Sequence, residues 1–98
     1  SGFVQTVYGL NGIKLPRDAY QQADIGTRVD DDFACWAAGD LIFFSERTAK
    51  ISHVAIALGD GDFIHASGFV KLNSLNQEHP DLFLEKYAKL FTRTMRVL

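Results

Sequence analysis

Two of the three histidines in this chain lie close together in a stretch of little polar character, SHVAIALGDGDFIHAS, which runs from Ser52 to Ser67. They are His53 and His65, and small or apolar residues and a GDGD turn separate them. Imidazole titrates near neutral pH, so it is the side chain best suited to general acid–base chemistry. A histidine that hydrogen-bonds another can fix its tautomer and ring angle, which is what a catalytic base needs.

The residues beside His53 indicate how its strand is buried. Side chains alternate between the two faces of a strand, so His53 shares a face with Ala55 and Ala57. The opposite face carries the bulky residues Val54, Ile56 and Leu58. We expect the bulky face to belong to the core. Because alanines allow a close neighbour, we also expect the helix at the start of the chain to pack on the histidine face.

The turn between the two strands decides whether the histidines can meet. A two-residue turn at Asp60–Gly61 in a regular ladder would place His65 on the face opposite to His53. A three-residue loop at 59–61 would set it against Ala55, with His53 as a diagonal neighbour at roughly 7–8 Å between backbone positions. The second glycine suits the left-handed position of such a loop. We therefore predict an odd-length loop and both histidines on one face.

A histidine pair needs a nucleophile, and Cys35 is the only thiol in the chain. A reactive cysteine usually lies at a helix N-terminus, where free N–H groups favour the thiolate. Cys35 belongs instead to TRVDDDFACWAAGD, which has no regular pattern. We predict that its side chain is buried and inert. One cysteine also excludes an internal disulfide framework.

These side chains also have structural interpretations. A lone strand histidine is more often a half-buried residue with a backbone partner than a catalyst. We expect His79, in NQEHP, to be a solvated loop residue, and the acidic run 30–32 to be a solvated turn rather than a cation site. The sequence contains no metal-binding spacing of the CxxC or HExxH type.

Composition limits the class of protein. The chain has 98 residues, of which 47% are hydrophobic and 22% charged, with a formal net charge of -2. This is the composition of one globular domain. Without a basic stripe, nucleic acid is not an expected partner. No apolar run reaches the ~18–20 residues of a transmembrane helix.

The pattern of apolar residues predicts an α+β fold. Helical spacing runs over residues 1–10 and 80–91, and a short helical turn follows Asp18. Short strands are predicted at residues 40–45, 51–58, 62–67, 69–74 and 92–98. This order predicts a mostly antiparallel sheet of about five strands with an N-terminal helix packed on it.

Five segments in this order carry a resemblance: SGFV, LPRDAYQQ, GDLIFF, SHVAIALGDGDFIHAS and RTMRVL. Together they cover nearly the whole chain and resemble the NlpC/p60-type peptidoglycan endopeptidases, which are papain-like cysteine peptidases. Each motif alone would be weak, but the ordered set is specific.

The resemblance implies roles for particular residues. It implies a nucleophilic cysteine immediately before Ser1, in a chain that starts within its catalytic domain (residues 1–98) and follows SH3-like domains. It implies that His53 is the general base, that His65 orients it, and that the Ser1 N–H helps to hold the oxyanion. The reaction needs no cofactor. A bacterial cell-envelope location, periplasmic or secreted, also follows from the resemblance.

Arg17 and Asp18 narrow the resemblance to one subgroup. The pair resembles the subgroup that cleaves the γ-D-glutamyl to L-diamino acid bond in murein peptides with a free N-terminal L-alanine. The resemblance implies that Asp18, helped by Ser1, binds the substrate ammonium, which is a charge-assisted contact. The alternative is that Asp18 caps the AYQQA turn, and the two roles are compatible.

Two departures from the family pattern stand out. Ala19 replaces a serine that often follows the aspartate in the subgroup, and AAGDL lacks the proline that usually precedes GDL. Two other functions stay open: a non-catalytic module that binds wall peptides, and a thiol acyltransferase on the same scaffold.

Overall fold

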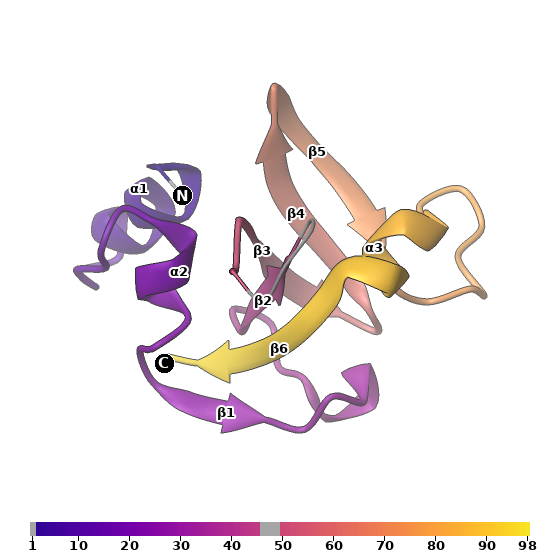
Figure 1. Ribbon diagram of the computed structural model, residues 1–98, viewed down its shortest axis with the longest axis horizontal. Coiled ribbons are helices and arrows are strands. Elements are labelled where there is room, and N and C mark those ends of the chain that lie inside the picture. Colours follow the sequence, from indigo (N-terminus) through magenta and orange to yellow (C-terminus); the bar gives the residue numbers. More distant parts are fainter. Residues whose placement is uncertain (1, 46–49) are drawn as a thin grey trace.

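An antiparallel sheet of six strands organises the computed structural model, which describes residues 2–45 and 50–98 (Figure 1). The strands are β1 (Thr27–Val29), β2 (Leu41–Phe44), β3 (His53–Gly59), β4 (Asp62–Ser67), β5 (Phe69–Ser74) and β6 (Phe91–Arg96). Their order across the sheet is β1-β6-β2-β3-β4-β5. The helices are α1 (Gly2–Leu10), α2 (Ala19–Gln22), α3 (Glu85–Leu90) and the 3-10 turn η1 (Phe33–Cys35). The predicted α+β class with an antiparallel sheet is confirmed.

The N-terminal helix covers one face of this sheet. Val4 and Tyr8, four residues apart in α1, are both buried. They pack with Phe43, Val54 and Ile56 in one apolar cluster. The bulky face of β3 is therefore core, as predicted. The prediction that the first helix packs on the histidine face is wrong, because the large side chains of β2 and β3 fill the space beneath the helix and the alanines do not face it.

Aromatic side chains cover the other face. Ala55 and Ala57 belong to a second cluster with Phe63 and with Tyr87 of α3. In Figure 1, α1 and α2 lie to the left of the sheet, and α3 lies at the right, where β5 ends and β6 begins. The small residues leave room for these rings, one of which α3 supplies, and the N-terminal helix does not pack there.

The β3–β4 hairpin differs from the predicted loop. Gly59 pairs with Asp62, so the turn consists of Asp60–Gly61, and both of these residues have positive φ, 57° and 87°. The prediction of a three-residue loop is wrong. The register then shifts between Ala57 and Gly59, so that Ala57 pairs with Phe63.

This β-bulge has the same effect as an odd-length loop. Leu58 is the extra residue on β3, and its side chain is exposed. Ile56 then pairs with Ile64 rather than with His65. A bulge re-aims the side chains that follow it, and here it moves His65 onto the face of His53.

The predicted helix at 80–91 is shorter in the structure. Helical residues occupy only Glu85–Leu90. Before them, Phe83 forms a parallel bridge with Ser74, and the Leu82 carbonyl accepts a hydrogen bond from the Ser74 N–H. The apolar residues that suggested a helix are thus used to extend the sheet beside β5.

The short strand β1 was not predicted. It has three residues and pairs with β6, placing Arg28 opposite Met95. All three are at least partly exposed, so the alternation that marks a half-buried strand is missing. Within the described residues, no helix combines the length and apolar character needed to cross a membrane.

Candidate active site

The two histidines form a hydrogen-bonded pair on one face of the sheet. Nε2 of His53 lies 2.8 Å from Nδ1 of His65. Nε2 of His65 lies 2.7 Å from Oδ1 of Asn73, which stands on the neighbouring strand β5. The Asn73 amide nitrogen in turn donates to the Leu82 carbonyl at 3.0 Å. The prediction that both histidines share a face is confirmed, and the structure adds Asn73, which sequence reasoning missed.

Aromatic rings hold the pair in place. The ring centroid of Tyr87 lies 6.3 Å from that of His53 and 5.1 Å from that of His65. Phe44 packs on His53 at 5.7 Å, and Phe63 packs on His65 at 5.0 Å. His65 is fully buried, whereas His53 is partly exposed. One imidazole is thus open to solvent at the surface, and the other supports it from inside.

Burial and nearby positive charge keep the pair neutral. Burial, and after it the His65 ring and the Lys71 and Lys86 ammonium groups, lower the pKa of His53 to about 4. Burial also lowers the pKa of His65, while its hydrogen bond to Asn73 acts in the opposite direction. At neutral pH His53 therefore carries a free lone pair, which is the form that accepts a proton.

Asp18 lies at the N-cap position of α2, but its side chain makes no capping hydrogen bond. Its backbone carbonyl accepts from the N–H groups of Gln21 and Gln22. The carboxylate is exposed. In the described part of the chain no hydrogen bond or ion pair joins it to either histidine, although α2 packs against β3. The substrate-binding role of Asp18 thus stays a prediction, and that of Ser1 lies outside the described residues.

A buried glutamine holds the loop that carries Asp18. Gln22 is completely buried, and its amide nitrogen donates to the carbonyls of Pro16 at 2.6 Å and Arg17 at 3.3 Å. This fixes the path of the chain through LPRDAYQQ. Sequence reasoning did not single out Gln22, because a glutamine in a short polar helix is usually exposed.

Comparison with known proteins identifies the family. Residues 1–88 match the NlpC/P60 family. The chain belongs to the NlpC/P60 family. The match confirms the resemblance to NlpC/p60-type proteins that the sequence motifs indicated.

The relatives of this NlpC/P60 domain include named peptidases. It is 39% identical over 93 residues to the gamma-D-glutamyl-L-lysine dipeptidyl-peptidase of Bacillus cereus (strain ATCC 10987), covering 90% of this chain and 26% of the relative. It is 32% identical over 101 residues to the murein DD-endopeptidase MepS/murein LD-carboxypeptidase of Escherichia coli (strain K12), covering 100% of this chain and 48% of the relative. The chain thus spans from about a quarter to about half of these relatives.

Solved structures support the fold. An NlpC/P60 family protein from Bacillus cereus ATCC 10987 superposes with a TM-score of 0.81 at 32% identity, covering 98% of this chain and 30% of that one. RipD from Mycobacterium tuberculosis, described as a non-catalytic NlpC/p60 domain protein adapted to peptidoglycan binding, superposes with a TM-score of 0.76 at 26% identity, covering 99% and 64%. The NlpC/P60 fold therefore also occurs in a protein that is described as non-catalytic.

Cys35 is exposed, so the prediction of a buried thiol is wrong. It ends the one-turn helix η1, which Asp32 caps by accepting a hydrogen bond from the Ala34 N–H at 3.0 Å. This hydrogen bond stabilises a turn of the chain at the surface. The acidic run is a solvated turn, as predicted, since Asp30, Asp31 and Asp32 are all exposed.

His79 is not the solvated residue that its sequence context suggested. Its Nδ1 lies 2.6 Å from the Asp62 carboxylate, and its Nε2 lies 3.2 Å from that of Asp60. The pairs tie the loop before α3 to the β3–β4 turn. The hydrogen bond to Asp62, with the nearby charges of Asp62, Asp60 and Glu78, raises the pKa of His79.

This pairing predicts a pH-dependent contribution to stability. Because the folded state raises the pKa of His79, the protonated ring stabilises the fold fully below the unfolded pKa of about 6.5 and loses this effect as the pH rises through the folded pKa. His79→Gln should therefore lower the free energy of unfolding at pH 5.5 and have a smaller effect at pH 9. Urea denaturation of both proteins at each pH measures this difference. An effect of the same size at both pH values would contradict the assignment.

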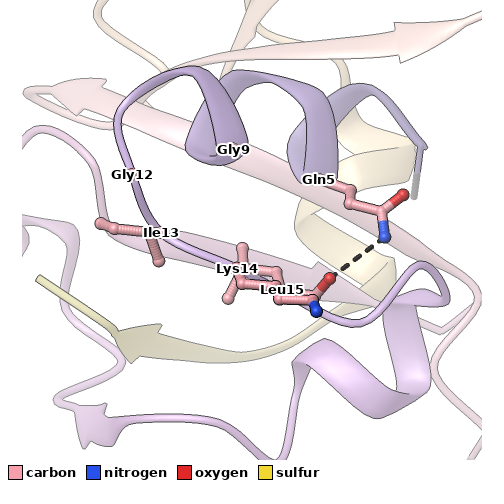
Figure 2. A pocket seen from close by; sticks show the side chains of 6 residues that line it. All are labelled: Gln5, Gly9, Gly12, Ile13, Lys14 and Leu15. Atoms are coloured by element: carbon pink, nitrogen blue, oxygen red, sulfur yellow. Dashed lines mark hydrogen bonds between the residues drawn. The ribbon is translucent and has the colours of Figure 1, made fainter.

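A pocket of about 290 Å³ lies beside α1 (Figure 2). Its wall includes Gln5, whose amide nitrogen donates to the Leu15 carbonyl at 3.1 Å. The lining residues are Gln5, Gly9, Gly12, Ile13, Lys14 and Leu15. None of them belongs to the histidine site, so this pocket is separate from the candidate active site.

Proposed function

We propose that the full protein is a cysteine peptidase that hydrolyses the γ-D-glutamyl to L-diamino acid amide bond of murein peptides with a free N-terminal L-alanine. The hydrogen bond of 2.8 Å between His53 and His65 carries this proposal. It supplies a neutral base whose ring is oriented by a third polar group, here a second imidazole, as nucleophilic catalysis requires. The relative of 39% identity named gamma-D-glutamyl-L-lysine dipeptidyl-peptidase supports the bond specificity.

The proposed reaction has two steps. His53 takes the proton of a cysteine thiol, and the thiolate attacks the γ-D-glutamyl carbonyl; the protonated His53 then returns the proton to the leaving amine, which leaves a thioester. In the second step His53 takes a proton from water, the hydroxide attacks the thioester, and the thiol regains the proton. We propose that this cysteine immediately precedes Ser1, because Cys35 ends a short surface turn and has no helix N-terminus to favour its thiolate.

The residues proposed to bind the substrate are those implied by the resemblance to the γ-D-glutamyl to L-diamino acid peptidase subgroup. We propose that Asp18 binds the ammonium group of the L-alanine, and that Arg17 and Ser1 also contact the substrate. We also propose that residues 1–98 form the catalytic domain of a protein with preceding SH3-like domains. We propose that it acts at the bacterial cell envelope, periplasmic or secreted.

One observation favours a second function. RipD shares this fold at 26% identity and is described as non-catalytic and adapted to peptidoglycan binding. A protein that kept the fold around the histidines but lacked the nucleophile would bind wall peptides without cleaving them. The residue before Ser1 separates the two functions.

A peptide assay with the full-length protein tests the proposal. L-Ala-γ-D-Glu-L-Lys should yield L-Ala-D-Glu and free lysine, which mass spectrometry detects. Replacing the cysteine before Ser1 by alanine should abolish release, while Cys35→Ala should retain it. Binding of the peptide without cleavage, together with a residue other than cysteine before Ser1, would contradict the peptidase and support the binding module.

A further inference from the structure

The Leu82 carbonyl fixes which way the Asn73 amide points. Its oxygen accepts hydrogen bonds from the Ser74 N–H and from Nδ2 of Asn73, both at 3.0 Å. A carbonyl oxygen can only accept, so the NH2 group of Asn73 must face Leu82. Oδ1 of Asn73 therefore faces Nε2 of His65, at 2.7 Å. The orientation of this amide follows from its partners.

The amide orientation determines the protons on both rings. Because Oδ1 of Asn73 can only accept, Nε2 of His65 must carry the hydrogen of that bond. A neutral His65 then has its lone pair on Nδ1. That nitrogen lies 2.8 Å from Nε2 of His53, which must in turn donate. His53 is left with its lone pair on Nδ1.

We propose that Asn73 is a positioning residue that sets the tautomers of both histidines and so makes Nδ1 of His53 the proton acceptor. This inference rests on the proposed peptidase function. Asn73 does not touch the substrate or the reacting atoms. It acts through His65: the Asn73 amide fixes the tautomer of His65, and His65 then fixes the tautomer of His53.

Burial disfavours the other tautomer of His65. His65 is completely buried and Asn73 is 8% exposed, so water cannot replace a lost partner. The other tautomer of His65 would bring its Nε2 lone pair against Oδ1 of Asn73 at 2.7 Å. A buried polar group that loses its hydrogen bond is strongly disfavoured.

Backbone hydrogen bonds fix the position of the Leu82 carbonyl, which accepts from Asn73. The N–H groups of Leu82 and Phe83 both donate to the His79 carbonyl, at 3.0 and 2.9 Å. Phe83 also bridges to Ser74 beside Asn73. The Leu82 carbonyl thus belongs to a closed turn against β5, so its direction does not depend on a flexible side chain.

Two substitutions separate positioning from loop anchoring. Asn73→Leu removes both the acceptor for His65 and the donor to Leu82, whereas Asn73→Asp keeps the acceptor and loses the donor. We expect Asn73→Leu in the full-length protein to lower kcat for the peptide about tenfold with KM unchanged, the lower end of the effect seen when a histidine that binds a metal loses the partner of its other ring nitrogen. Asn73→Asp should keep most of the activity at alkaline pH. Its carboxylate should move the acid limb of the kcat/KM profile to higher pH, because it stabilises an imidazolium.

A role in loop anchoring alone predicts a different result. Both variants would then lose activity equally, because both lose the bond to Leu82. That outcome would overturn the proposal.

The tautomers can be measured without any reaction. In full-length protein labelled with 15N-histidine, long-range 1H–15N spectra at pH 8 should show both His53 and His65 protonated at Nε2. Asn73→Leu should give mixed tautomers at His65. A wild-type His65 protonated at Nδ1 would overturn the proposal even if Asn73→Leu failed to fold. If the spectra agree but no peptide is cleaved, the tautomer assignment stands and the peptidase function fails.

Discussion

His53→Ala in the full-length protein should lower kcat/KM for L-Ala-γ-D-Glu-L-Lys by about 10²–10⁴-fold, the usual contribution of a positioned general base. The lowered pKa of His53, about 4, keeps the ring neutral and ready to accept a proton at neutral pH. Its side chain is only partly buried, so truncation leaves little unfilled core. Because Nδ1 of the buried His65 loses its partner, we also expect a modest loss of stability in a protein that still folds, with the large loss in the rate.

His79→Ala is the matched control for this variant. It removes the same type of side chain from a partly exposed position, where the ring pairs with Asp62 and Asp60 outside the candidate site. Circular dichroism should show both variants folded, and only His53→Ala should lose turnover. His65→Ala should lose less than His53→Ala, because orientation is secondary to proton transfer. Near wild-type turnover of His53→Ala would rule out its role as the base.

The sequence predicts that His53 and His65 share a face of the sheet, but it does not predict the β-bulge that brings His65 onto that face. Alternation alone placed His53 beside Ala55, and the turn was expected to bring His65 there. In a regular ladder, the number of loop residues decides which face His65 occupies. A bulge at Leu58 changes the count by one, and an exposed leucine in a strand carries no sequence signal that marks it as the extra residue.

Burial was predicted well where the pattern was long and poorly where it was short. The bulky positions of β3 and the stripe of α1 gave the core, because each repeats a period. Cys35 and β1 lie in segments of three regular residues, too short to show any period. The packing partner of the alanines was also misassigned, since small residues indicate close approach but not whether a helix or aromatic rings supply it.

Asn73 could not be found from sequence at all. It follows three apolar residues and a lysine in FVKLN, where an asparagine usually marks the end of a strand. Its function depends on β5 pairing with β4, which sets Asn73 opposite Phe63, and on a carbonyl from residue 82. Such a contact between distant segments is a property of the fold.

Asp18→Asn should lower kcat/KM for the peptide with a free N-terminal amine by about 10–100-fold, the range expected for a lost charge-assisted hydrogen bond. The N-acetylated peptide offers no ammonium group, so its slower cleavage should not change. Stability should also hold, because the Asp18 side chain makes no capping bond and asparagine is as good an N-cap as aspartate.

Asp24→Asn provides the matched control. It removes the same charge just beyond α2, where the Asp24 side chain is exposed and lies 3.3 Å from the Arg93 guanidinium. It should leave the ratio of the two peptides unchanged, whereas Asp18→Asn should bring that ratio closer to one. Because each ratio compares two substrates on one protein, a general loss of folded enzyme cancels. An equal loss on both peptides for Asp18→Asn would remove Asp18 from the amine site and leave it only a structural role at the start of α2.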